Sequence, residues 1–153
     1  MRTINEGFKE ANIAHDVSAA FRSEGYLVYP EFPFENGSID AVFIRDNEVV
    51  VSEWKRLYRK STPEIVDQTS RMMRFDPNVE LPKYGFKPRA WLVKRLWVCD
   101  VWDEFDDSVN WWSGSSSKIP TQYPFDSTWK KGKESFPDFN PEWSRYSWLW
   151  AYR

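Results

Sequence analysis

The chain has 153 residues, which is the size of one domain with one hydrophobic core. Its 41% hydrophobic and 18% aromatic residues exclude a disordered chain, while the net charge of −2 gives no overall attraction for polyphosphate. The single cysteine, Cys99, excludes an internal disulfide, and no export signal or membrane-length apolar run is visible, so a cytoplasmic protein without membrane contact is expected.

The first predicted elements are a helix and a strand. Thr3-Ile4-Asn5-Glu6 has the form of a capping box and Gly25 supplies a stop, so a helix of about twenty residues is expected between them. Residues 26–34 are rich in strand formers but contain two prolines, which indicates an edge strand or a strand that leads into a loop. Asn36-Gly37 then predicts a turn.

A hairpin is expected next. Two apolar runs, 38–44 and 49–56, are separated by the polar segment 45–48. If the chain turns on Asp46-Asn47, Asp40 lies directly opposite Glu53, with Cβ atoms about 4.5 to 5.5 Å apart. Like charges at such a pair are unfavourable, so a compensating positive charge is expected beside them.

The rest of the chain predicts a second helix, one more strand and irregular segments. Ser61-Thr62-Pro63-Glu64 favours a helix start, and Asp76-Pro77 an end. Residues 90–98 form another strand or a buried helix, which periodicity does not distinguish. We therefore expect one α/β domain over 1–153, with a mixed sheet flanked by helices. Its core covers about 4–100, and an aromatic-rich irregular C-terminal extension covers about 101–153.

The expected hairpin carries the residues suited to chemistry. Lys55 lies two residues after Glu53, hence on the same strand face, where its ammonium offsets part of the charge of Glu53 and Asp40. A divalent cation would offset the rest. Two carboxylates with a backbone carbonyl and waters suit Mg²⁺ or Mn²⁺, which bind few protein ligands when phosphate supplies others. The pattern therefore predicts a substrate that carries phosphate.

The first helix offers a third acid. Glu10 shares a helical face with a run of apolar residues, and a carboxylate on a buried face is costly unless it is paired or metal-bound. The apolar residues of this face are Ile13, Ala14, Val17 and Phe21. In the alternative, the helix is rotated and Glu10 faces solvent. His15, the only histidine, points away from this face and is expected to be exposed, so a histidine-based zinc site is disfavoured.

Ser38-Ile39-Asp40, followed after twelve residues by Glu53-Trp54-Lys55, resembles the PD-(D/E)XK nuclease superfamily, whose members have the restriction-endonuclease-like fold. The resemblance covers residues 4 to about 100, with an acid on the preceding helix and Gln68 on the following one. It implies that Asp40, Glu53 and the Trp54 carbonyl ligate Mg²⁺, that Lys55 orients or deprotonates the attacking water, and that Glu10 supports the metal site. Gln68 belongs to the same implied catalytic group.

The activity implied by the resemblance is Mg²⁺-dependent hydrolysis of DNA, with RNA less favoured, 5′-phosphate ends as products and Mn²⁺ able to substitute. Arg56, Arg59 and Lys60 are the expected nucleic-acid contacts, although an ordinary solvated surface is the favoured explanation of each such basic cluster taken singly. The second basic cluster contains Lys87, Arg89, Lys94 and Arg95. The alternative function is a non-catalytic protein of the same fold that binds nucleic acid or protein, for example a phage-encoded inhibitor.

The C-terminal third is unusually rich in tryptophan. Nine of the ten tryptophans lie between Trp91 and Trp150. They are expected mainly to pack against one side of the sheet, where aromatic rings bury large areas. In the alternative, some of them stack on bases or contact a partner, which is either another protein or a second copy in a homodimer.

Overall fold

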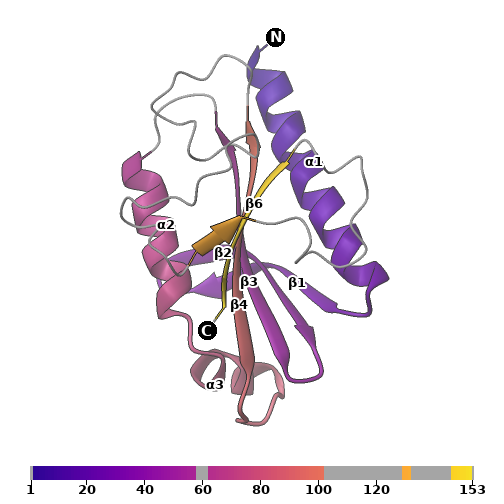
Figure 1. The fold of residues 1–153 in the computed structure, drawn as a ribbon, viewed down its shortest axis with the longest axis vertical. Helices are drawn as coiled ribbons and strands as arrows, with labels where there is room; N and C mark the ends of the chain where they lie inside the picture. The colour runs from indigo at the N-terminus through magenta and orange to yellow at the C-terminus, as the bar shows by residue number, and fades with distance from the viewer. Residues whose placement is uncertain (1, 58–61, 102–128, 132–145, 153) are drawn as a thin grey trace.

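The computed structural model describes residues 2–57, 62–101, 129–131 and 146–152, with the side chains of 13–54, 67–98 and Ala151. Over these ranges the chain forms a mixed sheet with helices on both faces, which confirms the predicted α/β class (Figure 1). The elements are α1 (Arg2–Ser23), β1 (Leu27–Phe34), β2 (Gly37–Arg45), β3 (Glu48–Leu57), α2 (Thr62–Arg74), α3 (Pro77–Glu80), the 3₁₀ helix η1 (Leu81–Tyr84), β4 (Leu92–Val101), β5 (Trp129–Lys131) and β6 (Tyr146–Tyr152).

The strand order within the described ranges is β1-β2-β3-β4-β6-β5. β1, β2 and β3 form an antiparallel meander, and β4 runs parallel to β3. A parallel neighbour requires a crossover connection, and α2, α3 and η1 lie in the segment that makes it. β1 is an edge strand, as its two prolines predicted. Proline has no backbone N–H, and on one side of an edge strand no N–H is needed to pair with a neighbouring strand.

The helix α1 covers one face of the sheet. It begins at Arg2, ahead of the predicted capping box, a difference of the size by which helix ends vary. It ends before Gly25, whose φ of +87° is the left-handed conformation that glycine accepts without a Cβ clash. Ile13, Val17 and Phe21 are buried and His15 is exposed, as the helical spacing predicted. Phe21 stacks on Phe43 of β2 with ring centroids 4.1 Å apart.

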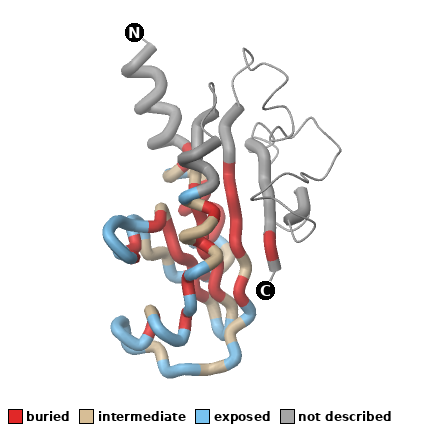
Figure 2. Tube along the Cα trace, turned by 90° about the vertical axis from the view of Figure 1, so that its left-hand side faces the viewer, coloured by how far each residue is buried: buried red, intermediate tan, exposed pale blue. Residues whose placement is uncertain are grey.

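Two hydrophobic clusters hold the sheet between the helices. The cluster on the α1 side contains Ile13, Val17, Phe21, Ala41, Phe43, Val50, Leu96 and Val98. The cluster on the α2 side contains Phe32, Ile39, Val42, Val49, Val51, Met72, Phe75 and Trp97. Buried residues run along the central strands, while the turns at the lower end of the view are exposed (Figure 2). β3 therefore contributes alternate residues to two cores, as a strand covered on both faces must.

The β2–β3 hairpin has the predicted register. It turns on Asp46-Asn47, and the pairs from Arg45 and Glu48 to Ala41 and Ser52 are those that this turn dictates. The preceding turn was predicted at Asn36-Gly37 but lies one residue earlier, at Glu35-Asn36, with Gly37 as the first residue of β2. Glu35 takes the positive φ of 55°, a conformation usually left to glycine or asparagine.

The second helix and the following strand also agree with expectation. Thr69 and Met72 of α2 are buried, and residues 92–101 form a strand and not a buried helix. Asp76-Pro77 ends α2 and also starts α3, because the Asp76 side chain accepts the Asn78 N–H at 3.0 Å and caps the new helix.

The prediction that the C-terminal part is irregular is wrong for two segments. β6 pairs antiparallel with β4 from Lys94–Tyr152 to Asp100–Tyr146, and β5 pairs with β6. The reason is that β4 is central and buried, so its second edge needs a strand to satisfy its backbone N–H and C=O groups. The tryptophan-rich terminal segment thus docks on its own sheet. The remaining residues of the extension, 102–128 and 132–145, lie outside the described ranges.

The interpretation of Arg95 as part of a solvated basic cluster is wrong. Its side chain is buried, and its guanidinium donates to the carbonyl oxygens of Met72 at 2.7 Å and Phe75 at 3.0 Å. These carbonyls end α2, where the helix dipole favours a positive charge. In the described part of the chain, no helix combines the length and hydropathy needed to cross a membrane.

Candidate functional site

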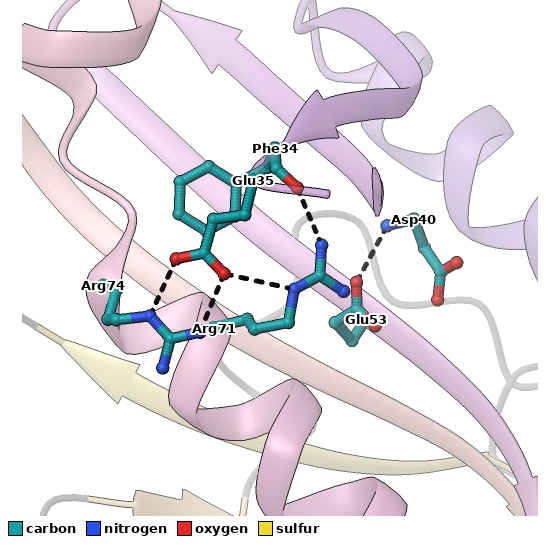
Figure 3. Close-up of polar contacts among 6 residues, drawn as sticks. All are labelled: Phe34, Glu35, Asp40, Glu53, Arg71 and Arg74. Atoms are coloured by element: carbon teal, nitrogen blue, oxygen red, sulfur yellow. Dashed lines mark hydrogen bonds and ion pairs between the residues drawn. The ribbon is translucent and has the colours of Figure 1, made fainter. Parts of the chain in front are cut away.

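The two acids expected to carry chemistry lie where the β2–β3 ladder ends. Its last paired residues are Ala41 and Ser52, and Asp40 and Glu53 follow on either strand. Beyond this pair, the side chains of the two acids accept the cross-strand hydrogen bonds in place of backbone carbonyls. The Glu53 carboxylate accepts the Asp40 N–H at 2.9 Å, and the Asp40 carboxylate accepts the Trp54 N–H at 2.7 Å. Figure 3 shows the first of these bonds.

These bonds correct one expectation about the pair. Asp40 and Glu53 were expected to face each other as like charges, with Lys55 and a cation as the only compensation. Instead, each carboxylate receives a backbone N–H from the other strand, and hydrogen bonds to a charged acceptor are stronger than neutral ones. Glu53 is only 2% exposed and Asp40 is half-buried, so this compensation acts where water screens little.

The side of the sheet that Glu53 occupies follows from its neighbours on β3. Val49 and Val51 pack in the α2-side cluster and Val50 in the α1-side cluster, so strand alternation puts Glu53 toward α2. Its partner on β4 is Trp97, which also packs on the α2 side and donates its indole N–H to Thr69 at 2.9 Å. Glu53 therefore lies beneath α2, next to a residue that α2 binds directly.

Trp54 points to the opposite side. Its indole N–H donates to the Ser52 hydroxyl at 2.9 Å, and that hydroxyl donates to the Leu96 carbonyl at 3.2 Å. The ring packs against the α1-side cluster. A large residue between Glu53 and Lys55 is thus accommodated, because it anchors β3 on the face away from the two charged positions. Its backbone carbonyl, the expected metal ligand, belongs to the residue whose N–H binds Asp40.

The other predicted site residues are placed by their elements. Lys55 and Arg56 lie on β3 opposite Cys99 and Asp100 of β4, which confirms that Lys55 follows Glu53 on the same strand. Glu10 lies in α1. The side chains of these three predicted residues, and the whole of Arg59 and Lys60, are outside the described part of the chain.

Gln68 lies on α2 next to Thr69, the residue that holds Trp97. Its amide oxygen is buried, and no group in the described ranges donates a hydrogen bond to it. A buried carbonyl oxygen of this kind calls for a donor or a cation. This observation keeps Gln68 among the candidate residues, on the side of the sheet where Glu53 lies.

The donor types suit the implied metal. Carboxylates and an amide oxygen are hard oxygen ligands of the kind that Mg²⁺ and Mn²⁺ prefer. An ionised carboxylate offers about four acceptor positions, so accepting a backbone N–H is compatible with ligating a cation as well. By type, Asp40, Glu53 and Gln68 therefore offer donors that suit a divalent cation, although the described residues include no group of three or more His, Cys, Asp or Glu side chains that could hold one.

A second polar cluster lies on the same side of the sheet, at the β1–β2 turn. The Glu35 carboxylate receives two bonds from Arg74, both at 2.8 Å, and lies 3.6 Å from the Arg71 guanidinium (Figure 3). The hydrogen bond from Arg74 is the largest effect that holds the pKa of Glu35 below its ordinary value. Sequence reasoning missed this cluster. Arg71 and Arg74 share a helix face by their spacing, but nothing in the sequence pairs them with Glu35.

Comparison of the sequence with protein-family models and with curated proteins gives no match. The function must therefore be inferred from the residues and their geometry. The two features available for this are the bonded acids at the end of the β2–β3 hairpin and the arginine pair at the end of α2.

Proposed function

We propose that the chain is a Mg²⁺-dependent nuclease with a restriction-endonuclease-like core that hydrolyses DNA phosphodiester bonds. The observation that carries this proposal is that the Asp40 and Glu53 carboxylates each accept a backbone N–H from the other's strand. The succession of helix, strand, hairpin, helix and parallel strand supports it, because the resemblance expects the motif on a hairpin between two such helices. Mn²⁺ is expected to substitute for Mg²⁺.

Asp40 and Glu53 would hold the cation, with the Trp54 carbonyl and Glu10 as further ligands. When bound, Mg²⁺ lowers the pKa of a coordinated water and neutralises charge that develops on the phosphate. Lys55 lies on the strand that carries Glu53 and would orient the attacking water or take its proton. Gln68 would orient a water or phosphate oxygen from α2. The products would carry 5′-phosphate and 3′-hydroxyl ends.

The hydrogen bonds found at the pair support such a role through preorganisation. The carboxylates of Asp40 and Glu53 are each held by a backbone N–H, so their positions depend on the hairpin register and not on a flexible side chain alone. A site built on two strands keeps its ligands within a narrow range of positions. Catalysis by positioned charge requires this, because reorganisation during the reaction then costs little.

The test is a cleavage assay on single-stranded, duplex, nicked and branched DNA and on RNA, with Mg²⁺, Mn²⁺ or EDTA. Asp40→Asn, Glu53→Gln and Lys55→Ala should each lose at least about 100-fold in rate. Glu80→Gln is the matched control, because Glu80 is paired with Lys83 on a surface helix and carries the same charge. Full activity of Asp40→Asn, or cleavage in EDTA, would contradict the proposal. Binding without cleavage would favour a non-catalytic protein.

A further inference from the structure

The last turn of α2 directs two guanidinium groups at the β1–β2 turn. Arg74 grips the Glu35 carboxylate with two parallel bonds of 2.8 Å, from Nε to one oxygen and from Nη2 to the other. Arg71 donates to the Phe34 carbonyl at 3.0 Å, and its Nε lies 3.6 Å from the same carboxylate. Two arginines from one helix face therefore converge on one anionic group.

This cluster adjoins the strand that carries Asp40. A Cβ built on Gly37 would come within 3.3 Å of the Arg71 guanidinium, so this arginine lies over the start of β2. Asp40 is three residues further along that strand. The next residue on α2, Met72, packs with Val51 of β3 in the α2-side cluster, toward which Glu53 also points. In the view of Figure 3 the Arg71 side chain lies between Glu35 and Glu53.

The bonding geometry is one that a phosphate can share. Guanidinium groups form the same two-bond fork with carboxylate and phosphate oxygens, and Arg is preferred over Lys where such planar recognition is needed. Glu35 is 37% exposed and Arg74 is 51% exposed, so a strand that approaches from solvent can reach them. Arg71 is only 17% exposed, so water would screen its attraction to a bound anion only weakly.

We propose that Arg71 and Arg74 bind a backbone phosphate of the nucleic-acid strand, next to the phosphate at which the strand is cut. When this phosphate binds, it displaces Glu35 from the two guanidinium groups. This inference rests on the proposed function, because that proposal identifies the bound strand as DNA. In the free protein Glu35 holds the two guanidinium groups in the arrangement that the phosphate then takes over. Glu35 is thus a competitor for the site, and its removal should strengthen binding.

A purely structural role for the cluster makes a different prediction. Arginines in the last turn of a helix interact favourably with its dipole, and the bonds to Glu35 and Phe34 also tie the β1–β2 turn to α2. That role would lower stability when Glu35 or Arg74 is changed, and would leave affinity for an oligonucleotide unaffected. If the cluster binds phosphate, the change at Arg74 weakens binding of the oligonucleotide and the change at Glu35 strengthens it.

The experiment measures binding of fluorescently labelled single-stranded and duplex oligonucleotides to the full chain in EDTA, over a range of salt concentrations. Arg74→Gln should weaken binding about 3- to 10-fold and reduce the slope of log Kd against log salt by about one. Glu35→Gln should strengthen binding by a similar factor. Arg74→Lys should recover only part of the loss, because it restores the charge without the fork.

Matched controls come from a second ion pair, in which the side chain of Lys83 is 64% exposed and that of Glu80 is 14% exposed. Lys83 lies 3.1 Å from Glu80, so Lys83→Gln and Glu80→Gln repeat the two charge changes away from α2. Neither should change Kd more than about 2-fold, since these charges are not part of the proposed phosphate site and salt screens charges that lie apart from it. Single ion pairs at the surface contribute little to stability, so all of these variants should fold, which thermal melting verifies.

The outcomes separate this inference from the nuclease proposal. If Arg74→Gln and Glu35→Gln behave like their controls while the parent cleaves DNA in Mg²⁺, the arginine pair is not a phosphate site and the nuclease proposal stands. If affinity shifts as expected but no nucleic acid is cleaved, the phosphate site stands and the nuclease proposal fails. A parent that binds none of the oligonucleotides would overturn the inference.

Discussion

The carboxylate of Glu53 accepts the backbone N–H of Asp40 at 2.9 Å, which links the two candidate acids by a hydrogen bond across neighbouring strands. The Asp40 carboxylate, in turn, accepts the N–H of Trp54. Both acids therefore have a structural role in closing the end of the β2–β3 ladder as well as their proposed chemical role. An amide side chain can keep the first role and lose the second, because its oxygen still accepts a hydrogen bond.

Asp40→Asn and Asp40→Ala should therefore separate stability from activity. Asn retains an acceptor for the Trp54 N–H, so it should cost less than about 1 kcal/mol, while Ala leaves that donor without its partner and should cost about 1–3 kcal/mol. Both variants should lose at least about 100-fold in cleavage rate. Urea denaturation and a cleavage assay on the same preparations measure the two effects. Equal stability of the two variants would mean that the bond to Trp54 is unimportant for folding.

Added Mg²⁺ should raise the melting temperature of the parent, because a ligand that binds only the folded state stabilises it by about 2.7 kcal/mol at 100 times its Kd. Glu53→Gln should respond much less. In EDTA this variant should stay within about 1 kcal/mol of the parent, since the weaker bond to the Asp40 N–H offsets the relief of like charge. Glu80→Gln should respond as the parent does. The same Mg²⁺ response in Glu53→Gln would exclude these carboxylates from the metal site.

The pKa of Glu35 should rise toward its ordinary value in Arg74→Gln, because the bond from Arg74 is the main effect that lowers it. A carboxyl whose folded pKa is lowered stabilises the protein above its unfolded-state pKa. That contribution is lost as the pH falls through the folded pKa. Carboxyl-carbon NMR titration of the parent and of Arg74→Gln measures the shift, with Lys83→Gln as a control that should leave Glu35 unchanged. An unshifted Glu35 would show that the carboxylate–guanidinium fork is not populated in solution.

Removal of residues 141–153 should lower stability more than intrinsic chemistry, because it deletes β6 and leaves β4 without a partner from Lys94 to Asp100. Ala151→Asp tests the same contact by one substitution. Ala151 is fully buried, so a carboxylate at this position would lose its hydration. It should cost more than about 3 kcal/mol in urea denaturation. An unchanged melting temperature with lost affinity for DNA would instead assign this segment to substrate or partner contact.

The local order of the chain could be predicted from the sequence. The polar Asp46-Asn47 turn between two β-branched runs specified the hairpin, and its register followed because a shift by one residue would move the apolar side chains to the wrong face. The face of α1 that is buried followed from helical spacing in the same way. These features depend on residues within a few positions of one another, so their pattern is visible in a single sequence. The register also placed Asp40 and Glu53 at the same end of the hairpin.

Only the tertiary structure decided what depends on distant segments. β6 occupies the edge of β4, which local pattern could not reveal, because pairing between strands far apart in sequence depends on which edge the rest of the fold leaves open. Arg95 is buried because the C-terminal carbonyls of α2 happen to meet it. The sequence predicted two acids at one end of the hairpin, but their bonds to backbone N–H groups depend on how the two strands leave the ladder there. As for Arg95, the sequence did not predict the arginines that α2 brings to Glu35. Helix packing across the sheet determines these contacts, and it leaves no periodic trace along the chain.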